Sequence, residues 1–215
     1  LVLLDQQDKP LALSPGDDAW NIIVWMDHRA TAEAAECTAT QAAPLRNLGG
    51  VMSPEMQMPK LMWLKRHRPE LYEKIGYAGD LGDWLGFKCT GSLERSVCML
   101  SCKWTFDPRP GHGWDHDFLK QVDMQDVLER ARLPDRALPV GVALGQLTEE
   151  AANDLGLTTR CTFAVGMIDA YAGALGTLGR SLADTPERRL AVIGGTSTCH
   201  IGAQPERREV PGVWG

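Results

Sequence analysis

The sequence predicts an α/β fold with a mixed β-sheet, chiefly because its last third alternates regularly. There, apolar runs typical of strands alternate with helix-forming runs, and this alternation characterises α/β proteins. The chain has 215 residues, of which 44% are hydrophobic and 23% are charged, as in an ordinary globular protein. The predicted strands of this part are residues 139–144, 161–168, 190–193 and 199–202, and the predicted helices are 148–155 and 169–178.

Local signals support these assignments. Thr148, followed by two glutamates, is a favoured N-cap, and Gly156 stands where a helix C-terminus often places a glycine. Residues 180–189 are polar and contain Pro186, which predicts a domain boundary. We therefore expect one domain over residues 1–183 and the start of a second over 184–215.

The first part of the chain predicts strands followed by helices. Residues 1–4 and 11–13 are expected to be strands joined by a polar turn. Residues 21–25 are almost wholly apolar, so we expect a third strand, buried on both faces. Residues 30–43 have helix-forming composition, and Ser53, Pro54 and Glu55 are a strong helix start. Further predictions are helices at 71–75 and 80–89, a strand or extended segment within 94–106, and a loop at 107–117.

Charge and cysteine usage exclude several classes of protein. The net charge is −6 and the isoelectric point about 5.4, which argues against a nucleic-acid or anionic-membrane partner. No apolar run has the length of a membrane helix and no signal peptide is recognisable, so we expect a cytoplasmic protein. The cysteines form no C-x-x-C pair, which predicts reduced, buried thiols; they are Cys37, Cys89, Cys98, Cys102, Cys161 and Cys199.

Asp169 is the first candidate for chemistry. It follows a predicted strand and opens a helix of small residues, and ligands of open α/β sheets bind at the carboxyl ends of strands. A carboxylate there can accept a proton from a hydroxyl that attacks phosphorus. The alternative is a plain helix N-cap. The small residues of the helix suit close packing against another backbone.

A glycine turn between two predicted strands is the second candidate. Glycines let backbone N–H groups turn inward and hydroxyls add donors, so the turn can cradle phosphate oxygens. The lysine and helix of a P-loop are missing, which excludes that family. The alternative is an ordinary hairpin turn. The turn consists of Gly194, Gly195, Thr196 and Ser197.

Two further segments could contact a polyol or sugar. At the end of the predicted strand 21–25, an aromatic ring, an acid, an imidazole and a guanidinium stand together as Trp25, Asp27, His28 and Arg29. The alternative is an Asp–Arg surface pair beside a core tryptophan. Lys103 could donate to a sugar hydroxyl, or could be a solvated surface lysine. A cluster that imitates a metal site, but is expected to be a solvated loop, comprises His112, Asp115, His116 and Asp117.

In order along the chain, these segments resemble the FGGY carbohydrate kinases, and among them the ribulokinase-like, D-ribulokinase-type branch. The matching stretches are Trp25 to Ala30, Pro59 to Lys65 with Pro69-Glu70, Asp83-Trp84-Leu85 with Thr90-Gly91, Cys102 to Trp104, Gly166 to Ala170, and Gly194 to Ser197.

The resemblance implies a ribonuclease H-like fold of the actin and hexokinase type, with sugar and MgATP bound in a cleft between two domains. It implies ATP and Mg²⁺ as cofactors and phosphorylation of a pentulose such as ribulose. By this resemblance, Asp169 matches the catalytic base of the family and Lys103 matches a lysine that contacts the sugar. Residues 27–30, including Ala30, match the wall of the sugar pocket. The glycine turn matches a loop that binds a nucleotide phosphate. Homodimers are common among such kinases, and no metal-ligating residue is assigned.

The chain departs from the family pattern at both ends. It lacks the opening strand with its Asp-x-Gly-Thr loop and the adenosine-binding glycines, so we expect a fragment that is inactive alone. Alternatives left open are a kinase for xylulose, ribitol or glycerol, a non-catalytic sugar-binding or regulatory relative, and another actin-like ATPase.

Overall fold

The computed structural model of this chain describes residues 1–14, 16, 19–195 and 197–214. The described strands are β1 (Val2–Leu4), β2 (Tyr77–Gly79), β3 (Ala143–Gln146), β4 (Thr162–Ala164), β5 (Leu190–Gly194) and β6 (Thr198–Gly202). The α-helices are α1 (Thr31–Ala39), α2 (Gln57–His67), α3 (Pro69–Tyr72), α4 (Leu81–Thr90), α5 (Val97–Lys103), α6 (His116–Gln121), α7 (Val127–Arg130), α8 (Glu149–Leu155), α9 (Asp169–Leu178) and α10 (Ser181–Asp184). Short 3₁₀ helices are η1 (Ala43–Leu48) and η2 (Pro186–Arg188).

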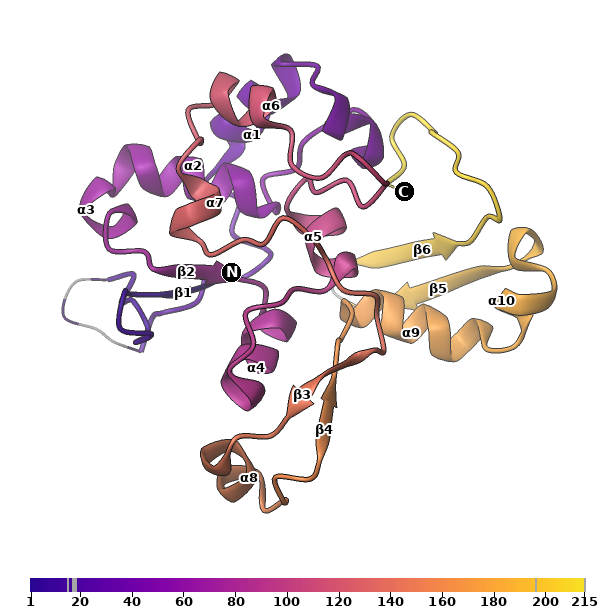
Figure 1. The fold of residues 1–215 in the computed structure, drawn as a ribbon. Coiled ribbons are helices and arrows are strands. Elements are labelled where there is room, and N and C mark those ends of the chain that lie inside the picture. The colour runs from indigo at the N-terminus through magenta and orange to yellow at the C-terminus, as the bar shows by residue number, and fades with distance from the viewer. Residues whose placement is uncertain (15, 17–18, 196, 215) are drawn as a thin grey trace.

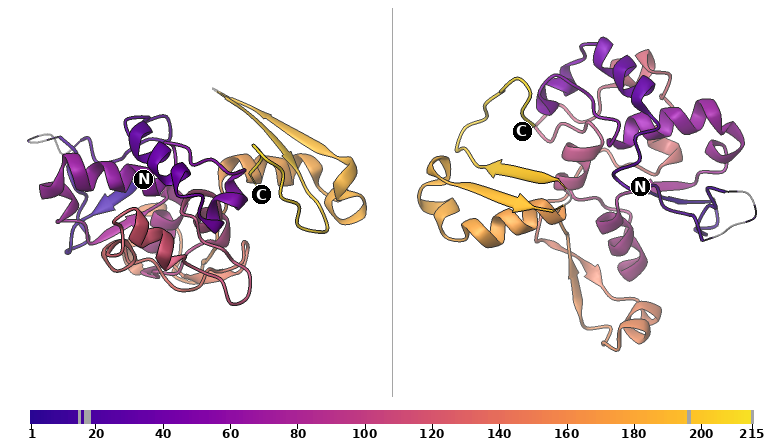
Figure 2. Two further views of the ribbon diagram at one scale, coloured as in Figure 1. Left: turned by 90° about the horizontal axis from the view of Figure 1, so that it is seen from above. Right: turned by 180° about the vertical axis from the view of Figure 1, so that it is seen from behind.

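The elements form a helical lobe from which two projections extend (Figure 1). Helices α1, α2, α3, α6 and α7 lie in the lobe, and α5 lies on its side nearest to β5, β6 and α9. One projection holds β3, β4 and α8, and the other holds α9, α10, β5 and β6. Two further views show the same division (Figure 2). Helix α5 therefore lies where the lobe meets the α9 projection.

The described strands pair as three separate two-stranded antiparallel sheets: β1 with β2, β3 with β4, and β5 with β6. The α/β class is confirmed, but the predicted mixed sheet is wrong for this part of the chain. Each described strand thus has one strand as its partner.

The main core lies in the helical lobe. It is built from side chains of strand β1, of the helices and of the loops between them, and includes Leu3, Leu45, Leu61, Trp104 and Phe118, none more than 2% exposed. A smaller apolar cluster joins α9 to β5 and β6 through Ala174, Leu178 and Ala191. The α9 projection thus has its own packing, separate from that of the lobe.

Several predicted elements are confirmed. Helix α9 has the predicted bounds, and the Thr148 side chain caps α8 by accepting from the backbone N–H of Ala151. Gly156 ends α8 in the left-handed conformation, with φ +65°. Strands β5 and β6 pair as a hairpin. These signals are local, so the surrounding fold does not override them.

The prediction for residues 11–13 and 21–25 is wrong. Neither segment is a strand; the second joins β1 only through the isolated bridge Val2–Ile22. Ile23 is buried, whereas Val24 is 51% exposed and Trp25 44%. A segment that faces the core on one side buries only alternate residues, whatever the hydrophobicity of the others.

The prediction of an extended segment within 94–106 is also wrong, because residues 97–103 form α5. The Ser96 side chain caps this helix by accepting from the N–H of Cys98. The predicted loop 107–117 holds up to Asp115, which caps α6. Helix α2 starts at Gln57, four residues after the predicted Ser53, since Ser53 to Met56 form a turn closed by the Met56 N–H and the Ser53 carbonyl.

The cysteines are all free thiols, but only Cys37 is fully buried and Cys199 is exposed. Within the described part of the chain, no helix combines the length and the apolar character that a membrane span needs. The C-terminal residues return to the lobe, where the Gly212 N–H donates to the Gly49 carbonyl at 2.9 Å.

Candidate functional site

The segment after Ile23 gathers the predicted sugar-wall residues into one polar cluster. The Arg29 Nε lies 3.0 Å from both carboxylate oxygens of Asp27, and the guanidinium lies 4.8 Å from the centre of the Trp63 ring. Hydrogen bonding from Arg29 lowers the pKa of Asp27. The Asp–Arg pair therefore forms and lies against Trp63, whereas Trp25 is 44% exposed and is not the core tryptophan of the alternative interpretation.

Lys60 on α2 anchors the backbone of this segment at Val24. Its side chain is 4% exposed, and its Nζ donates to the Val24 carbonyl at 2.9 Å. Burial lowers the pKa of Lys60 to about 8, with Asp27 opposing the shift and Lys103 adding to it. Lys60 thus lies within electrostatic range of Asp27 and of Lys103, two of the predicted substrate contacts.

The space between these side chains is small. A cavity of about 10 Å³ is lined by Ile23, Asp27, Arg29, Ala30, Lys60 and Trp63. It has room for one water molecule at most, and not for a sugar. His28 turns away from it and lies 3.3 Å from Glu55. These residues therefore form a wall, and any sugar would lie against its outer side.

A buried carboxylate connects this wall to the helix that carries Lys103. Asp80 accepts hydrogen bonds at 2.7 Å from Gln57 Nε2 on α2 and from Trp104 Nε1, directly after α5. Asp80 and Trp104 are both buried. Because its two oxygens bind the two elements, Asp80 fixes α2 relative to the end of α5. Lys103 itself is half-buried, with its Nζ 5.6 Å from the centre of the Trp214 ring.

Asp169 is the first residue of α9 and is exposed. Its Oδ1 accepts from the N–H of Ala170 at 2.8 Å, while Ile168 takes the N-cap position. The helix packs closely at Gly173, where a Cβ would lie 3.2 Å from the Ile193 side chain on β5, but this neighbour is a side chain and not the backbone that was expected. The small residues therefore let β5 approach the helix.

The glycine turn joins β5 to β6 as a hairpin turn. The Gly195 N–H donates to the Ser197 carbonyl at 2.9 Å, and Gly194 and Ser197 are exposed. Thr196 lies outside the described residues. This geometry matches the alternative that the sequence left open, and the phosphate-binding role stays a prediction.

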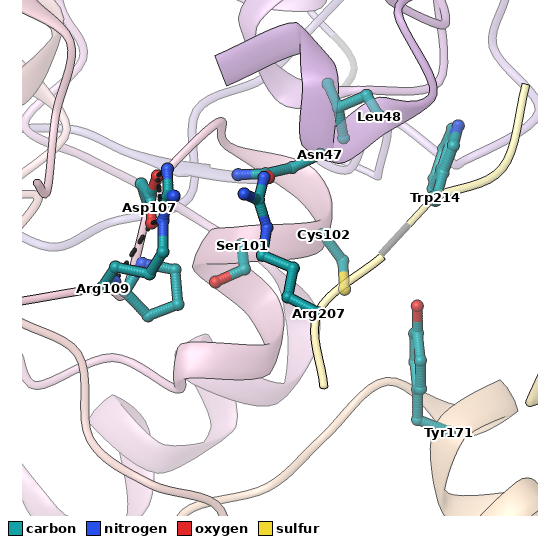
Figure 3. A pocket seen from close by; sticks show the side chains of 10 residues that line it. Asn47, Leu48, Ser101, Cys102, Asp107, Arg109, Tyr171, Arg207 and Trp214 are labelled. Atoms are coloured by element: carbon teal, nitrogen blue, oxygen red, sulfur yellow. Dashed lines mark hydrogen bonds and ion pairs between the residues drawn. The ribbon is translucent and has the colours of Figure 1, made fainter. Parts of the chain in front are cut away.

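A larger cavity of about 200 Å³ lies between α5, the start of α9 and the C-terminal segment (Figure 3). Cys102 from α5 and Tyr171 from α9 border it, together with Trp214, which contacts Lys103. The other lining residues are Asn47, Leu48, Ser101, Asp107, Pro108, Arg109 and Arg207. The helix bearing Lys103 and the helix opened by Asp169 therefore border the same cavity.

The polar side chains of the histidine-rich segment, residues 112–117, are not arranged around a common point. Asp115 caps α6, accepting from the Phe118 N–H at 2.8 Å, and the His112 ring lies 3.1 Å from the Pro110 carbonyl. Among the described residues, no group of three or more His, Cys, Asp or Glu side chains is arranged to hold a metal ion.

Comparison with known proteins identifies the family. The model of the N-terminal domain of the FGGY family of carbohydrate kinases matches residues 1–176. This chain belongs to the FGGY carbohydrate kinases. The resemblance expected from the sequence is thereby confirmed, and the family's fold is the ribonuclease H-like fold of actin and hexokinase.

The FGGY carbohydrate kinase domain-containing protein of Homo sapiens is 42% identical over all of this chain and 41% of its own length. The D-ribulokinase of Saccharomyces cerevisiae is 36% identical over 91% of this chain and 31% of its own length. The chain thus spans well under half of these relatives. The crystal structure of a xylulose kinase from Rhodospirillum rubrum is 22% identical, with a TM-score of 0.69 over 98% of this chain and 42% of that one. This likeness supports the fold alone.

Two charged residues of this FGGY chain were missed by sequence reasoning. Lys60 stands in an apolar helical run and Asp80 at a helix start, so both patterns predict structure rather than a site. Their partners, Val24, Gln57 and Trp104, lie 23 to 36 residues away in sequence. No short motif joins residues so far apart.

Proposed function

We propose that this chain is part of a longer ATP-dependent kinase that phosphorylates a sugar hydroxyl, with a pentulose such as ribulose as the acceptor. The observation that carries the proposal is the FGGY match over residues 1–176, supported by 36% identity to a D-ribulokinase. Residues 1–183 would form the sugar-binding domain and 184–215 the start of the nucleotide-binding domain. A cytoplasmic location and a homodimer belong to the same proposal.

Asp169 is proposed as the general base. It stands exposed at the start of α9, where its free oxygen can receive the proton of the acceptor hydroxyl. The hydroxyl oxygen attacks the γ-phosphorus in line, the bond to the β-phosphate oxygen breaks, and ADP leaves. A carboxylate in water is a weak base, so its contribution is the accurate placement of the proton acceptor.

Lys103 and the wall formed by residues 25–30 are proposed to orient the sugar. The Lys103 ammonium can donate to a sugar oxygen, and the Asp27–Arg29 pair offers both acceptors and donors. Mutual hydrogen bonds and the Trp63 ring hold this pair in place, so binding costs little side-chain entropy. Ala30 is 1% exposed, so it would shape the wall by packing rather than by a polar contact.

MgATP would supply the phosphoryl group and the charge that stabilises the transferring phosphate. The described residues include no three-ligand cluster, which fits an ion held mainly by nucleotide phosphates and water, with one or two protein carboxylates. The Gly194, Gly195, Thr196 and Ser197 turn is proposed to contact a nucleotide phosphate. Gly194, Gly195 and Ser197 are exposed, so these described residues of the turn are accessible to a ligand.

The test measures sugar-stimulated ADP release with MgATP in the full-length protein and in its Lys103→Met variant. We expect Lys103→Met to raise the KM for the sugar about tenfold or more, because a charge-assisted hydrogen bond to the substrate is lost. The KM for ATP should stay within about twofold. An unchanged KM for the sugar would contradict the role of Lys103. We also expect the isolated 215-residue chain to show no turnover, and robust phosphorylation by it would contradict that part.

A further inference from the structure

Ser96 makes three hydrogen bonds at the start of α5 through its N–H and its hydroxyl, besides the bond that its carbonyl accepts from the Leu100 N–H. Its N–H donates to Asp83 Oδ1 at 2.9 Å, and its Oγ accepts from the Cys98 N–H at 3.2 Å. The same hydroxyl donates its proton to the Gly166 carbonyl at 2.7 Å, across 70 residues of sequence. The residue is 1% exposed. The hydroxyl therefore both accepts and donates, and it joins the start of α5 to the backbone of residue 166.

The Gly166 carbonyl lies in the short connection between β4 and α9, three residues before Asp169. Residues 165–168 belong to no helix or strand. Hydrogen bonds between Val165 and the backbone of residues 141 and 142 hold the start of this connection. The Ser96–Gly166 hydrogen bond joins α5 to the middle of the connection. Helix α5 is thus the support on which the Asp169 segment rests.

The other end of α5 carries Lys103. The helix has seven residues, so its two ends lie about 10 Å apart along a stiff rod. Its C-terminal end is itself fixed, because Asp80 accepts from the adjacent Trp104. One rigid element therefore contacts the base's segment at one end and bears the proposed sugar lysine at the other.

We propose that Ser96 is a positioning residue for phosphoryl transfer, which through its bond to the Gly166 carbonyl sets the place of Asp169 relative to Lys103. The inference rests on the proposed function of these two residues. Loss of the hydroxyl leaves the Gly166 carbonyl without this donor and lets the connection shift. A misplacement of about 1 Å can cost about a hundredfold in rate, because the reacting atoms are no longer in line.

The experiment compares Ser96→Ala, Ser96→Thr and the control Thr177→Ala in the full-length protein. The Thr177 hydroxyl on α9 also donates to a glycine carbonyl, that of Gly173, at 2.8 Å. Thr177 lies eight residues after Asp169 and is exposed, so this bond does not restrain the connection before Asp169. We expect Ser96→Ala to lower kcat between tenfold and about a hundredfold, with the KM for the sugar within about threefold. Ser96→Thr keeps the donor and should recover most of kcat, and Thr177→Ala should retain it.

Amide hydrogen exchange provides a readout that does not depend on activity. In Ser96→Ala the amides of residues 166–170 should exchange about tenfold faster, since one hydrogen bond that restrains the connection is gone. Thr177→Ala should leave them unchanged. Retained kcat together with unchanged exchange at residues 166–170 would overturn the inference, as would equal losses in Ser96→Ala and Ser96→Thr.

The two proposals fail in different ways. If the unaltered protein shows no sugar-stimulated ADP release, the proposed function fails, and the inference fails with it as a statement about catalysis. The exchange data then still decide whether Ser96 restrains the connection. If the unaltered protein is active and Ser96→Ala equals it, only the role of Ser96 is refuted. If Ser96→Ala does not fold, a low kcat for a folded Ser96→Thr would likewise refute the role of the hydroxyl.

Discussion

Among the polar contacts near the candidate site, the hydrogen bond between Trp104 and Asp80 should contribute most to the free energy of unfolding. Trp104 is 0% exposed, and its Nε1 donates to the buried carboxylate at 2.7 Å. Trp104→Phe keeps an aromatic ring but removes this donor. A hydrogen bond to a charged group contributes about 1.5–3 kcal/mol, and the loss of buried ring area adds about 1 kcal/mol. We therefore expect the free energy of unfolding to fall by about 3 kcal/mol.

Trp84 offers a matched control. Its indole Nε1 is also buried, but has no hydrogen-bond acceptor among the described residues. Trp84→Phe therefore removes ring area without breaking a hydrogen bond, and should cost about 1 kcal/mol or less. The two variants should differ by about 2 kcal/mol, which corresponds to about 4–8 °C in the thermal midpoint for a domain of this size.

The assay is urea and thermal unfolding of the two variants and of the unaltered protein, followed by circular dichroism. In an Asp80→Asn background the cost of Trp104→Phe should fall, because the acceptor no longer carries a charge. Equal destabilisation by Trp104→Phe and Trp84→Phe would refute the reasoning, since ring area alone would then account for both. An undiminished cost in the Asp80→Asn background would refute the role of the charge.

Three further predictions concern stability. Burial raises the pKa of Asp83 to about 7, so between about pH 4 and 7 the folded state holds a proton that the unfolded state has lost. The free energy of unfolding therefore falls as pH rises through this window. The Asp83→Asn variant keeps an acceptor for the Ser96 N–H, and its urea midpoint should rise relative to that of the unaltered protein between about pH 5 and 8. The pH dependence that Lys60 contributes has the opposite sign. Its pKa is lowered to about 8, so the folded state releases this proton before the unfolded state does, and the free energy of unfolding rises above pH 8. The Lys60→Met variant should lack this rise when stability is measured between about pH 7 and 9.5. Gly49 has φ +70°, and a Cβ there would lie 2.6 Å from a backbone nitrogen of the C-terminal segment. Gly49→Ala should therefore lower the thermal midpoint through both backbone strain and this clash. Gly50→Ala is the control, because a Cβ there meets open space and should cost only backbone strain of about 1 kcal/mol.

The fold was predictable where short sequence signals decide it. The helix opened by Asp169 and the helix capped by Thr148 follow from neighbouring residues, and both predictions hold. Residues 97–103 were not predictable in this way, because a short apolar run is compatible with a strand or a helix. The local signal for this helix is Ser96, which caps it by accepting from the Cys98 N–H. The bonds of Ser96 to Asp83 and Gly166 join residues that are distant in sequence and could not be predicted.

The candidate site divides in the same way. The pairing of Asp27 with Arg29 follows from their spacing. The family resemblance supplied Lys103 and Asp169 as candidates, and their roles stay predictions. The contacts of Lys60 with Val24 and of Asp80 with Trp104, which hold the segments of Asp27 and Lys103, are tertiary contacts. Such contacts depend on how helices pack, and no local pattern in the sequence records them.

The most direct test of the account is coupled ADP release by the full-length protein with MgATP and a panel of D-ribulose, L-ribulose, D-xylulose, ribitol and glycerol. The account predicts stimulation by one pentulose, and a loss of at least about a hundredfold in kcat in Asp169→Asn, since a general base contributes about 10²–10⁴. The control is Asp184→Asn, which alters an acid at the far end of the same projection and should leave the rate unchanged. No stimulation by any of the sugars, or an unchanged rate in Asp169→Asn, would contradict the proposal that Asp169 is the base of a sugar kinase.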